Sequence, residues 1–96
     1  MNWQKLEKIQ DAEGNIFYRR PDGGKFKFKE GRYMQVRWHT GQETEERIER
    51  KTERVEILRD GHGWFIDSEI PIFKLKYLGA PVDVALEDVE LILHGF

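Results

Sequence analysis

The chain has 96 residues, of which 39% are hydrophobic, 35% are charged and twelve are aromatic. This composition fits one folded domain with a modest core and excludes a disordered chain, which rarely carries so many aromatic rings. The absence of cysteine excludes disulfides, thiolate nucleophiles and cysteine metal sites.

The compartment is expected to be the cytoplasm. A secreted domain of this size usually carries disulfides, and residues 1–5 show no apolar signal segment. No apolar run approaches the roughly 18 residues that a membrane-spanning helix needs, so no membrane partner is expected.

Charge is unevenly distributed along the chain, although the formal net charge is only −2. Residues 1–40 contain nine Lys or Arg and five Asp or Glu, a net charge of +4. Residues 41–96 contain seven and thirteen, a net charge of −6. If folding preserves this asymmetry, the molecule has a basic and an acidic surface.

The first thirty residues predict a β-meander. Residues 3–10 fit a strand because the turn-forming residues 11–15 follow, although the spacing of Trp3, Leu6 and Ile9 also fits a short helix. Residues 15–20 and 25–29 form a clearer pair of strands around the Pro-Asp-Gly-Gly turn. Alternation over 25–29 places Phe26 and Phe28 on the core side.

The stretch 31–41 predicts a half-buried strand that ends in a Thr-Gly turn. Alternation places three apolar residues on one face, namely Met34, Val36 and Trp38. The opposite face carries Tyr33, Gln35, Arg37 and His39.

The next stretch, 43–54, has nine charged residues out of twelve, so little of it can be buried. A helix fits, because Glu43–Arg47 and Glu46–Arg50 are spaced as ion pairs four residues apart. A strand fits as well, and the alternation over 52–57 favours it. We predict strands here, with an α+β fold carrying a helix at 43–58 as the alternative.

The last third of the chain predicts four short strands. A turn at 60–63 leads into 64–66, and 67–69 is expected to be a loop. Residues 72–78 alternate with Phe73, Leu75 and Tyr77 pointing inward. After a turn at 79–81, strands at 82–85 and 89–93 flank one helical turn at 86–88.

Three features of residues 31–96 resemble the SH3-like and Tudor-like β-barrels. They are Val36-Arg37-Trp38 before a Thr-Gly turn, a Gly63-Trp64 hairpin, and the segment 84–89 near the end. The resemblance implies a short helical turn before the last strand. The expected fold is therefore all-β, a single domain over 1–96 with an N-terminal meander at 1–30 and a small SH3-like barrel at 31–96.

No residue pattern points to catalysis, a metal or a cofactor. The three histidines, His39, His62 and His94, lack the spacing of a ligand motif. Ser68, the only serine, lacks the glycines of a nucleophile elbow. We expect a protein that is not an enzyme and needs no cofactor.

Aromatic side chains are the candidate partner-binding residues. Trp64 and Phe65 are adjacent, so on a strand they face opposite ways, and one of them is expected in the core. SH3-like grooves hold peptides or modified side chains between such rings. The leading hypothesis is a small adaptor module that binds an unknown protein, in the manner of accessory proteins of phages or mobile elements. Its binding residues are expected to be Tyr33, Trp38, Trp64 and Phe65, or alternatively the charged stretch 43–54.

Two alternatives stay open. A basic-aromatic run over 18–37 predicts nucleic-acid binding, in which cations follow the phosphates and rings stack on bases. Its candidate residues are Arg19, Arg20, Lys25, Lys27, Lys29 and Arg37. The second alternative is a structural homo-oligomer in which edge strands pair between copies.

Overall fold

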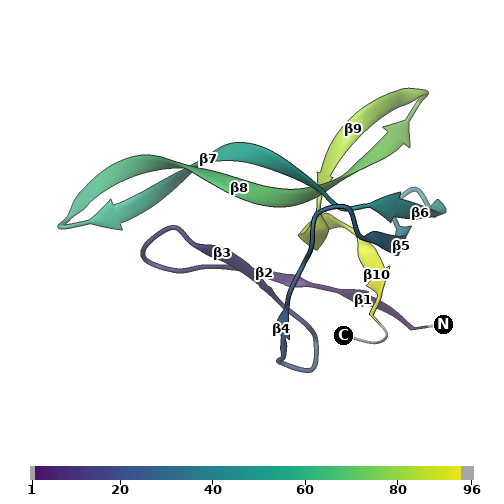
Figure 1. Cartoon of the computed structure of the whole chain (residues 1–96), viewed down its shortest axis with the longest axis horizontal. Helices are drawn as coiled ribbons and strands as arrows, with labels where there is room; N and C mark the ends of the chain where they lie inside the picture. Colours follow the sequence, from purple (N-terminus) through teal and green to yellow (C-terminus); the bar gives the residue numbers. More distant parts are fainter. Residues whose placement is uncertain (1, 94–96) are drawn as a thin grey trace.

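The computed structural model describes residues 2–93 and consists of antiparallel strands with one 3-10 turn (Figure 1). The strands are β1 (Trp3–Lys5), β2 (Glu7–Gln10), β3 (Ile16–Arg19), β4 (Lys25–Phe26), β5 (Tyr33–Arg37), β6 (Glu43–Arg47), β7 (Glu49–Arg59), β8 (His62–Tyr77), β9 (Ala80–Ala85) and β10 (Glu90–Ile92). The 3-10 turn, η1 (Leu86–Asp88), precedes the last strand as expected. The all-β class is confirmed.

The strands form three sheets, in the orders β1-β10-β5-β6, β2-β3-β4 and β7-β8-β9. None of these sheets closes on itself within residues 2–93, so a closed SH3-like barrel is not confirmed. The alternative of a helix over 43–58 is wrong, because β6 and β7 occupy this stretch. Cross-strand pairing supplies the backbone hydrogen bonds that a helix would have supplied.

A bent segment connects two of the sheets. β6 pairs with β5 and β7 pairs with β8, and between them lies the fully buried Ile48. The Ile48 N–H donates to the carbonyl of Arg32, and the Ile48 carbonyl accepts from the N–H of Gly31, both at 2.8 Å. Residues 43–59 therefore act as one strand that changes sheet at a corner.

β8 is much longer than expected. It runs without a break through 67–69, so the predicted loop there is wrong. Its first part pairs with β7 and its last part with β9, and Ile72 is paired on both sides. Pro71 lies where β7 is the only neighbouring strand, a position at which a residue without an N–H is tolerated.

The core lies where the three sheets meet. β8 is buried on both faces over residues 70–73, and Tyr77, expected inside, is 45% exposed. The central cluster consists of Leu6, Tyr18, Phe26, Met34, Val36, Ile48, Phe73, Leu75, Val84, Leu86, Val89 and Leu91. Phe28 and Trp38 pack against it and are partly buried. The inward positions predicted for five residues are confirmed, namely Phe26, Met34, Val36, Phe73 and Leu75.

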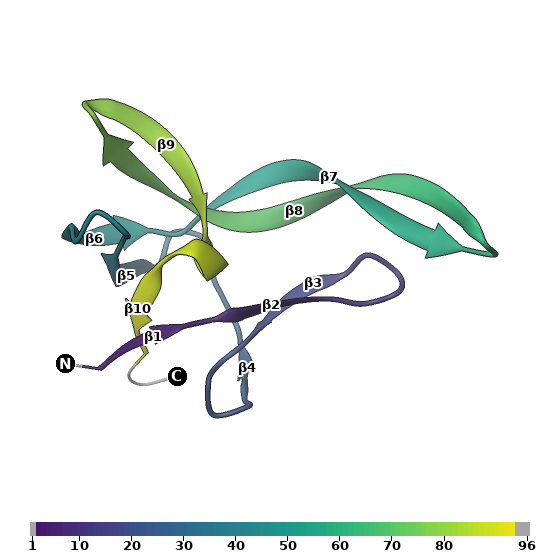
Figure 2. The same ribbon diagram turned by 180° about the vertical axis from the view of Figure 1, so that it is seen from behind.

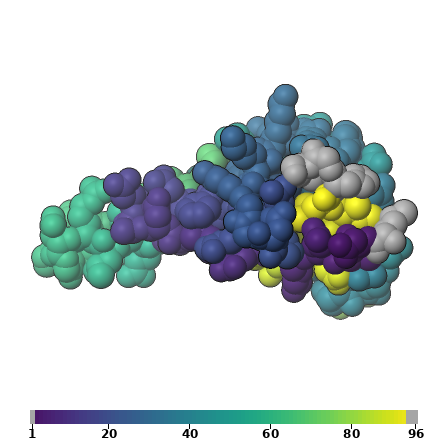
Figure 3. Space-filling view, turned by 90° about the horizontal axis from the view of Figure 1, so that it is seen from below, coloured from purple at the N-terminus to yellow at the C-terminus, as the bar shows by residue number. Residues whose placement is uncertain are grey.

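The outer part of the β7–β8 hairpin, residues 53–67, is hereafter called the arm. It projects from the body, and the β2–β3 hairpin lies along one face of it (Figures 2 and 3). The overall dimensions are accordingly elongated, 45 × 33 × 22 Å.

The turn between β2 and β3 holds the arm in place. Gly14 has a φ of +84°, and a Cβ at this position would lie 2.6 Å from side-chain carbons of Ile57 and Ile66. The side-chain amide of Gln10 also donates to the carbonyl of Glu56 at 3.0 Å. A glycine is therefore needed here both for its backbone conformation and for close approach. The predicted turn at 11–15 and the strand character of 3–10 are confirmed, with a break at Leu6.

A buried tyrosine connects the meander to the body. The Tyr18 hydroxyl donates to Glu87 Oε2 at 2.9 Å, and Lys8 Nζ lies 3.8 Å from Glu87 Oε1. Burial and the neighbouring Glu87 carboxylate raise the pKa of Tyr18 far above its usual value. Tyr18 therefore stays protonated and donates this hydrogen bond throughout the neutral range.

Candidate functional site

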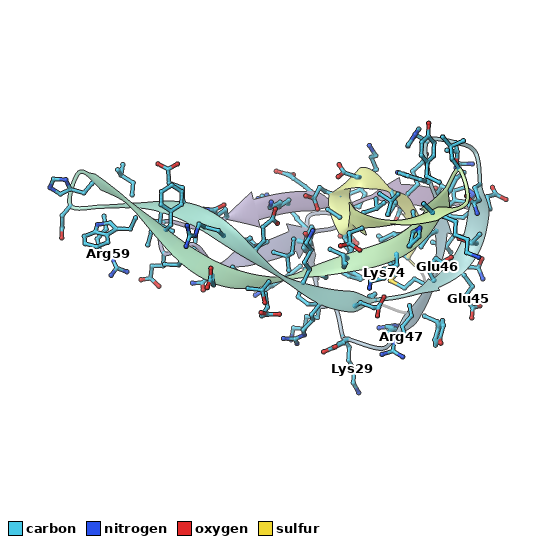
Figure 4. The ribbon with its side chains drawn as sticks, turned by 90° about the horizontal axis from the view of Figure 1, so that it is seen from above. Lys29, Glu45, Glu46, Arg47, Arg59 and Lys74 are labelled. Atoms are coloured by element: carbon cyan, nitrogen blue, oxygen red, sulfur yellow. The ribbon has the colours of Figure 1, made fainter. Side chains whose placement is uncertain are left out.

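Three large apolar side chains are exposed on the arm. Leu58 is 71% exposed, Trp64 57% and Phe65 63%. We call these three residues the apolar tip. They lie close to the turn between β7 and β8, at the end of the molecule that Arg59 marks in Figure 4.

The strand register places the members of the apolar tip on two faces. Ile57 pairs with Trp64, so both side chains lie on the inner face, the one that contacts Gly14. Leu58 pairs with Gly63 and Phe65 pairs with Glu56, which places Leu58 and Phe65 together on the outer face. Gly63 has no side chain to cover them. Trp64 lies two residues before the half-buried Ile66 on the same inner face, and it remains exposed.

The turn at the end of the arm has a local cause. Asp60 and Gly61 have φ values of +52° and +77°, as in a two-residue type I′ hairpin turn. Asp and Gly are favoured in this turn because both tolerate positive φ. The tight turn brings Leu58 and Phe65 into diagonal positions on the outer face.

Charged side chains surround the apolar tip. The Arg54 guanidinium lies 5.8 Å from the centroid of the Phe65 ring, within reach of a cation–π interaction. The arm contains two arginines and four carboxylates, a net charge of −2. The surface is therefore a small apolar centre with an acidic border, a composition suited to protein contacts and not to phosphates.

The four aromatic residues predicted to form one groove do not lie together. Trp64 and Phe65 point to opposite faces as expected, but neither is in the core. Trp38 lies near the other end of β8, where its ring centroid is 5.7 Å from that of Tyr77. Tyr33 is exposed on β5, opposite Arg47. Partner binding by these residues stays a prediction, now for separate surfaces.

Sequence reasoning missed three exposed apolar residues, Leu58, Tyr77 and Leu78. Leu58 lies two residues before the Asp60-Gly61 turn, and Leu78 is the first residue of the Leu78-Gly79 turn. An apolar residue in or beside a turn is a sequence signal for an exposed apolar side chain, because such positions are usually exposed.

The basic run is divided between structural and exposed roles. Arg37 donates to Glu90 at 2.7 Å, lies 3.8 Å from Glu43 and covers the Trp3 ring at 4.8 Å. Arg20 lies 3.3 Å from an Asp22 carboxylate oxygen. Lys25 Nζ lies 5.3 Å from the centroid of the Phe17 ring. Arg37 thus holds strands of the body together and is poorly placed to contact a ligand.

Two open hollows lie on the meander. One, of about 420 Å³, is lined by Ile16, Phe17, Lys25, Phe26, Lys27 and Phe28. The other, of about 520 Å³, is lined by Lys5, Leu6, Glu7, Arg19, Arg20, Pro21 and Gly23. Lys29 points away from the body (Figure 4). The predicted nucleic-acid-binding residues other than Arg37 therefore all lie on the meander.

Residues 2–93 contain no group of three His, Asp or Glu side chains that could hold a metal ion. His62 lies at the end of the arm and His39 beside Trp38, near opposite ends of β8, and His94 lies outside the described residues. Ser68 lies within β8, paired with Glu53. In the described part of the chain, no helix is long and apolar enough to cross a membrane.

Comparison of the chain with protein-family models, with curated proteins and with solved structures found no match. The functional argument therefore depends on the geometry and chemistry of the chain itself.

Proposed function

We propose that this chain is a non-enzymatic binding module that contacts a protein partner through the apolar tip. The observation that carries the proposal is the exposure of Leu58, Trp64 and Phe65 together on a projecting arm. Single exposed apolar residues are common, but a group of three at the end of a hairpin is typical of a contact surface.

The residue types support this proposal. Trp is enriched among the few interface residues that supply most of the binding energy, and Phe is enriched in interfaces generally. The arm also presents its residues on paired strands, which fixes their relative positions before binding and lowers the entropic cost of association.

We also propose that residues 31–93 form an open variant of the SH3-like architecture, with the arm as an extended hairpin. Three observations support it: the bent strand shared by two sheets, the 3-10 turn before the last strand, and the pairing of β10 with β5. The cytoplasm remains the expected compartment because the chain contains no cysteine.

Capture of a partner from cells that express the protein tests the binding role. The wild-type chain is expected to retain a partner that is lost by the double variant Leu58→Ser/Phe65→Ser. Tyr33→Ser, which changes another exposed aromatic residue, serves as the matched control and should retain the partner. Equal retention by the double variant would contradict the proposal.

Nucleic-acid binding is the second candidate function. It is favoured by the hollow that combines Lys25 and Lys27 with phenylalanine rings. The expected result is binding of single-stranded DNA that weakens steeply with salt and is lost in Lys25→Glu/Lys27→Glu. Arg37→Gln is a poor test of this candidate. Arg37 holds strands of the body together, so its loss would disturb the fold whether or not it contacts nucleic acid. Binding that is insensitive to salt would exclude this candidate.

A further inference from the structure

The two faces of the sheet β2-β3-β4 have different surroundings. Tyr18 is buried, so its face of β3 packs against the body. Arg19 pairs with Lys25 on one side and with Glu7 on the other, and all three residues are exposed. Because side chains alternate along a strand, Arg19 and Phe17 lie on the opposite face, which we call the outer face. The meander lies in front of the arm in Figure 3.

A hollow opens where β4 is shorter than its neighbour β3. β4 pairs only with Tyr18 and Arg19, so the first two residues of β3 extend beyond it. The chain leaves the sheet after Phe26, and a hollow of about 420 Å³ lies at this place. The half-buried Phe17 ring lines it, with Lys25 Nζ 5.3 Å from the ring centroid. An accessible aromatic ring therefore lies beside an ammonium group.

The second hollow, of about 520 Å³, lies at the other end of β3. Its charged lining residues are three cations, Lys5, Arg19 and Arg20, and one carboxylate, Glu7. Arg19 of this hollow is the direct cross-strand partner of Lys25 in the first hollow. Directly opposed residues have Cα atoms about 4.5–5.5 Å apart. Two adjacent cations therefore connect the hollows across the outer face.

The surface remains positive when all carboxylates of the meander are counted. Residues 1–30 contain seven Lys or Arg and five Asp or Glu, a net charge of +2. Four of these carboxylates do not line the hollows, namely Asp11, Glu13, Asp22 and Glu30. Asp11 accepts backbone N–H groups in the β2–β3 turn, and Glu30 lies 3.3 Å from Arg50. The lining residues themselves contain five cations and one carboxylate, which suits an anionic chain.

We propose that the outer face binds a single-stranded nucleic acid along the path between the two hollows. A base stacks on the Phe17 ring. The phosphates contact Arg19, Lys25 and Lys27. A duplex hides the faces of its bases, so only an unpaired strand can stack on a ring while its phosphates contact neighbouring cations. The proposal rests on the second candidate function and adds the face, the strand state and the role of each residue.

Three or four phosphate contacts determine the expected salt dependence. Each contact with a single strand contributes about −0.7 to the slope of log affinity against log salt, so the slope should be about −2 to −3. The affinity should then fall roughly 16- to 64-fold between about 50 and 200 mM salt. Loss of the stacking ring should weaken binding roughly 5- to 150-fold and leave the slope unchanged, because stacking involves no counterion release.

Fluorescence anisotropy of a labelled oligothymidylate of about 12 nucleotides, titrated with the full chain over this salt range, tests the proposal. Phe17→Leu should weaken binding at every salt concentration with an unchanged slope. Arg19→Gln and Lys25→Gln should each make the slope shallower by about 0.7. The controls Phe65→Leu and Lys76→Gln change an exposed ring and an exposed cation outside the meander, and they should bind like the wild type.

Wild-type affinity for Phe17→Leu would overturn the proposal, as would a slope that neither Arg19→Gln nor Lys25→Gln changes, or tighter binding of a duplex. In each of these cases salt-dependent nucleic-acid binding would still stand. A wild-type chain that binds no oligonucleotide would exclude the second candidate function together with this proposal. Competition with an oligouridylate of the same length shows whether DNA or RNA binds more tightly, and either supports the proposal.

Amide NMR spectra verify that each variant is folded. Arg19 is exposed, so the slope measured for Arg19→Gln tests the proposal even if Phe17→Leu disturbs the sheet.

Discussion

The two parts of β8 differ although they belong to one continuous strand. Residues 70–73 are buried on both faces, because three sheets meet around them. Residues 62–65 are exposed on both faces, although two of them are Trp64 and Phe65. Large apolar side chains of the same strand are therefore buried at one end and exposed at the other, depending on whether other sheets cover them.

This difference separates stability from binding. Substitutions in the buried part of β8 should change the free energy of unfolding, because they remove packing that the whole domain shares. Substitutions at the apolar tip should change association and leave stability nearly constant. A protein that places its exposed rings on a projecting hairpin can alter its contact surface without disturbing its core.

The largest expected effect comes from Phe73→Ala. Phe73 is fully buried, so its loss should lower the free energy of unfolding by about 3–5 kcal/mol, through lost burial and a residual cavity. Phe65→Ala removes the same side chain from the exposed part of the same strand and should cost less than about 0.5 kcal/mol. Urea unfolding of both variants measures the difference, and equal costs would show that the arm shares the core's packing.

Gly14→Ala should detach the arm from the β2–β3 hairpin. The added methyl would lie 2.6 Å from side-chain atoms of Ile57 and Ile66, and φ is +84°. Gly23 has a similar φ of +88° with nothing within 4 Å of a Cβ, so Gly23→Ala carries the backbone strain alone. We expect Gly14→Ala to cost roughly 1–3 kcal/mol more than Gly23→Ala.

Hydrogen exchange locates the effect of Gly14→Ala. Faster exchange should appear in residues 53–67, whereas the strands of the body keep their protection. Uniformly faster exchange would mean that the hairpin contact supports the whole domain and that the arm is not a separable element.

Tyr18→Phe should lower the free energy of unfolding by about 1–2 kcal/mol at pH 7, because it removes a partly buried hydrogen bond to a carboxylate. The effect should depend on pH. The pKa of Tyr18 is raised in the folded state, so its stabilising contribution is complete below the unfolded-state pKa of about 10. Above that pH the unfolded chain loses the proton first, and stability falls by up to about 1.4 kcal/mol per pH unit.

The pH dependence is measured as the difference between variant and wild type, so that contributions from lysines cancel. The stability cost of Tyr18→Phe should shrink as pH rises above about 10. Tyr33→Phe, which removes an exposed hydroxyl, is measured in the same way as the control. A constant cost for Tyr18→Phe would mean that Tyr18 titrates at its ordinary pKa.

Much of the fold could be predicted from local pattern. The alternation around Phe26, Met34 and Phe73, together with the Gly-containing turns, identified the all-β class and five of the twelve residues in the central cluster. The break expected at 67–69 was wrong because polar residues were taken as a loop. In the structure they lie within β8, paired with Thr52, Glu53 and Arg54 of β7, where polar side chains are partly or fully exposed.

The sequence could not predict how the residues of the candidate site are arranged in space. Aromatic residues on strands give the same alternating pattern whether their faces are covered or open. What covers each face depends on distant segments, such as the contact of Gly14 with the arm and the proximity of Trp38 to Tyr77. Such contacts between residues far apart in sequence are not encoded in any local window.

The smallest expected effect on stability comes from exchanging the turn residues. Leu78→Asn places a residue that tolerates positive φ in a turn of the same geometry as Asp60-Gly61. It should raise the free energy of unfolding by a few tenths of a kcal/mol up to about 1 kcal/mol. Asp60→Leu makes the reverse exchange at the other turn and should lower it by a similar amount. Thermal unfolding of both variants at low protein concentration measures these changes.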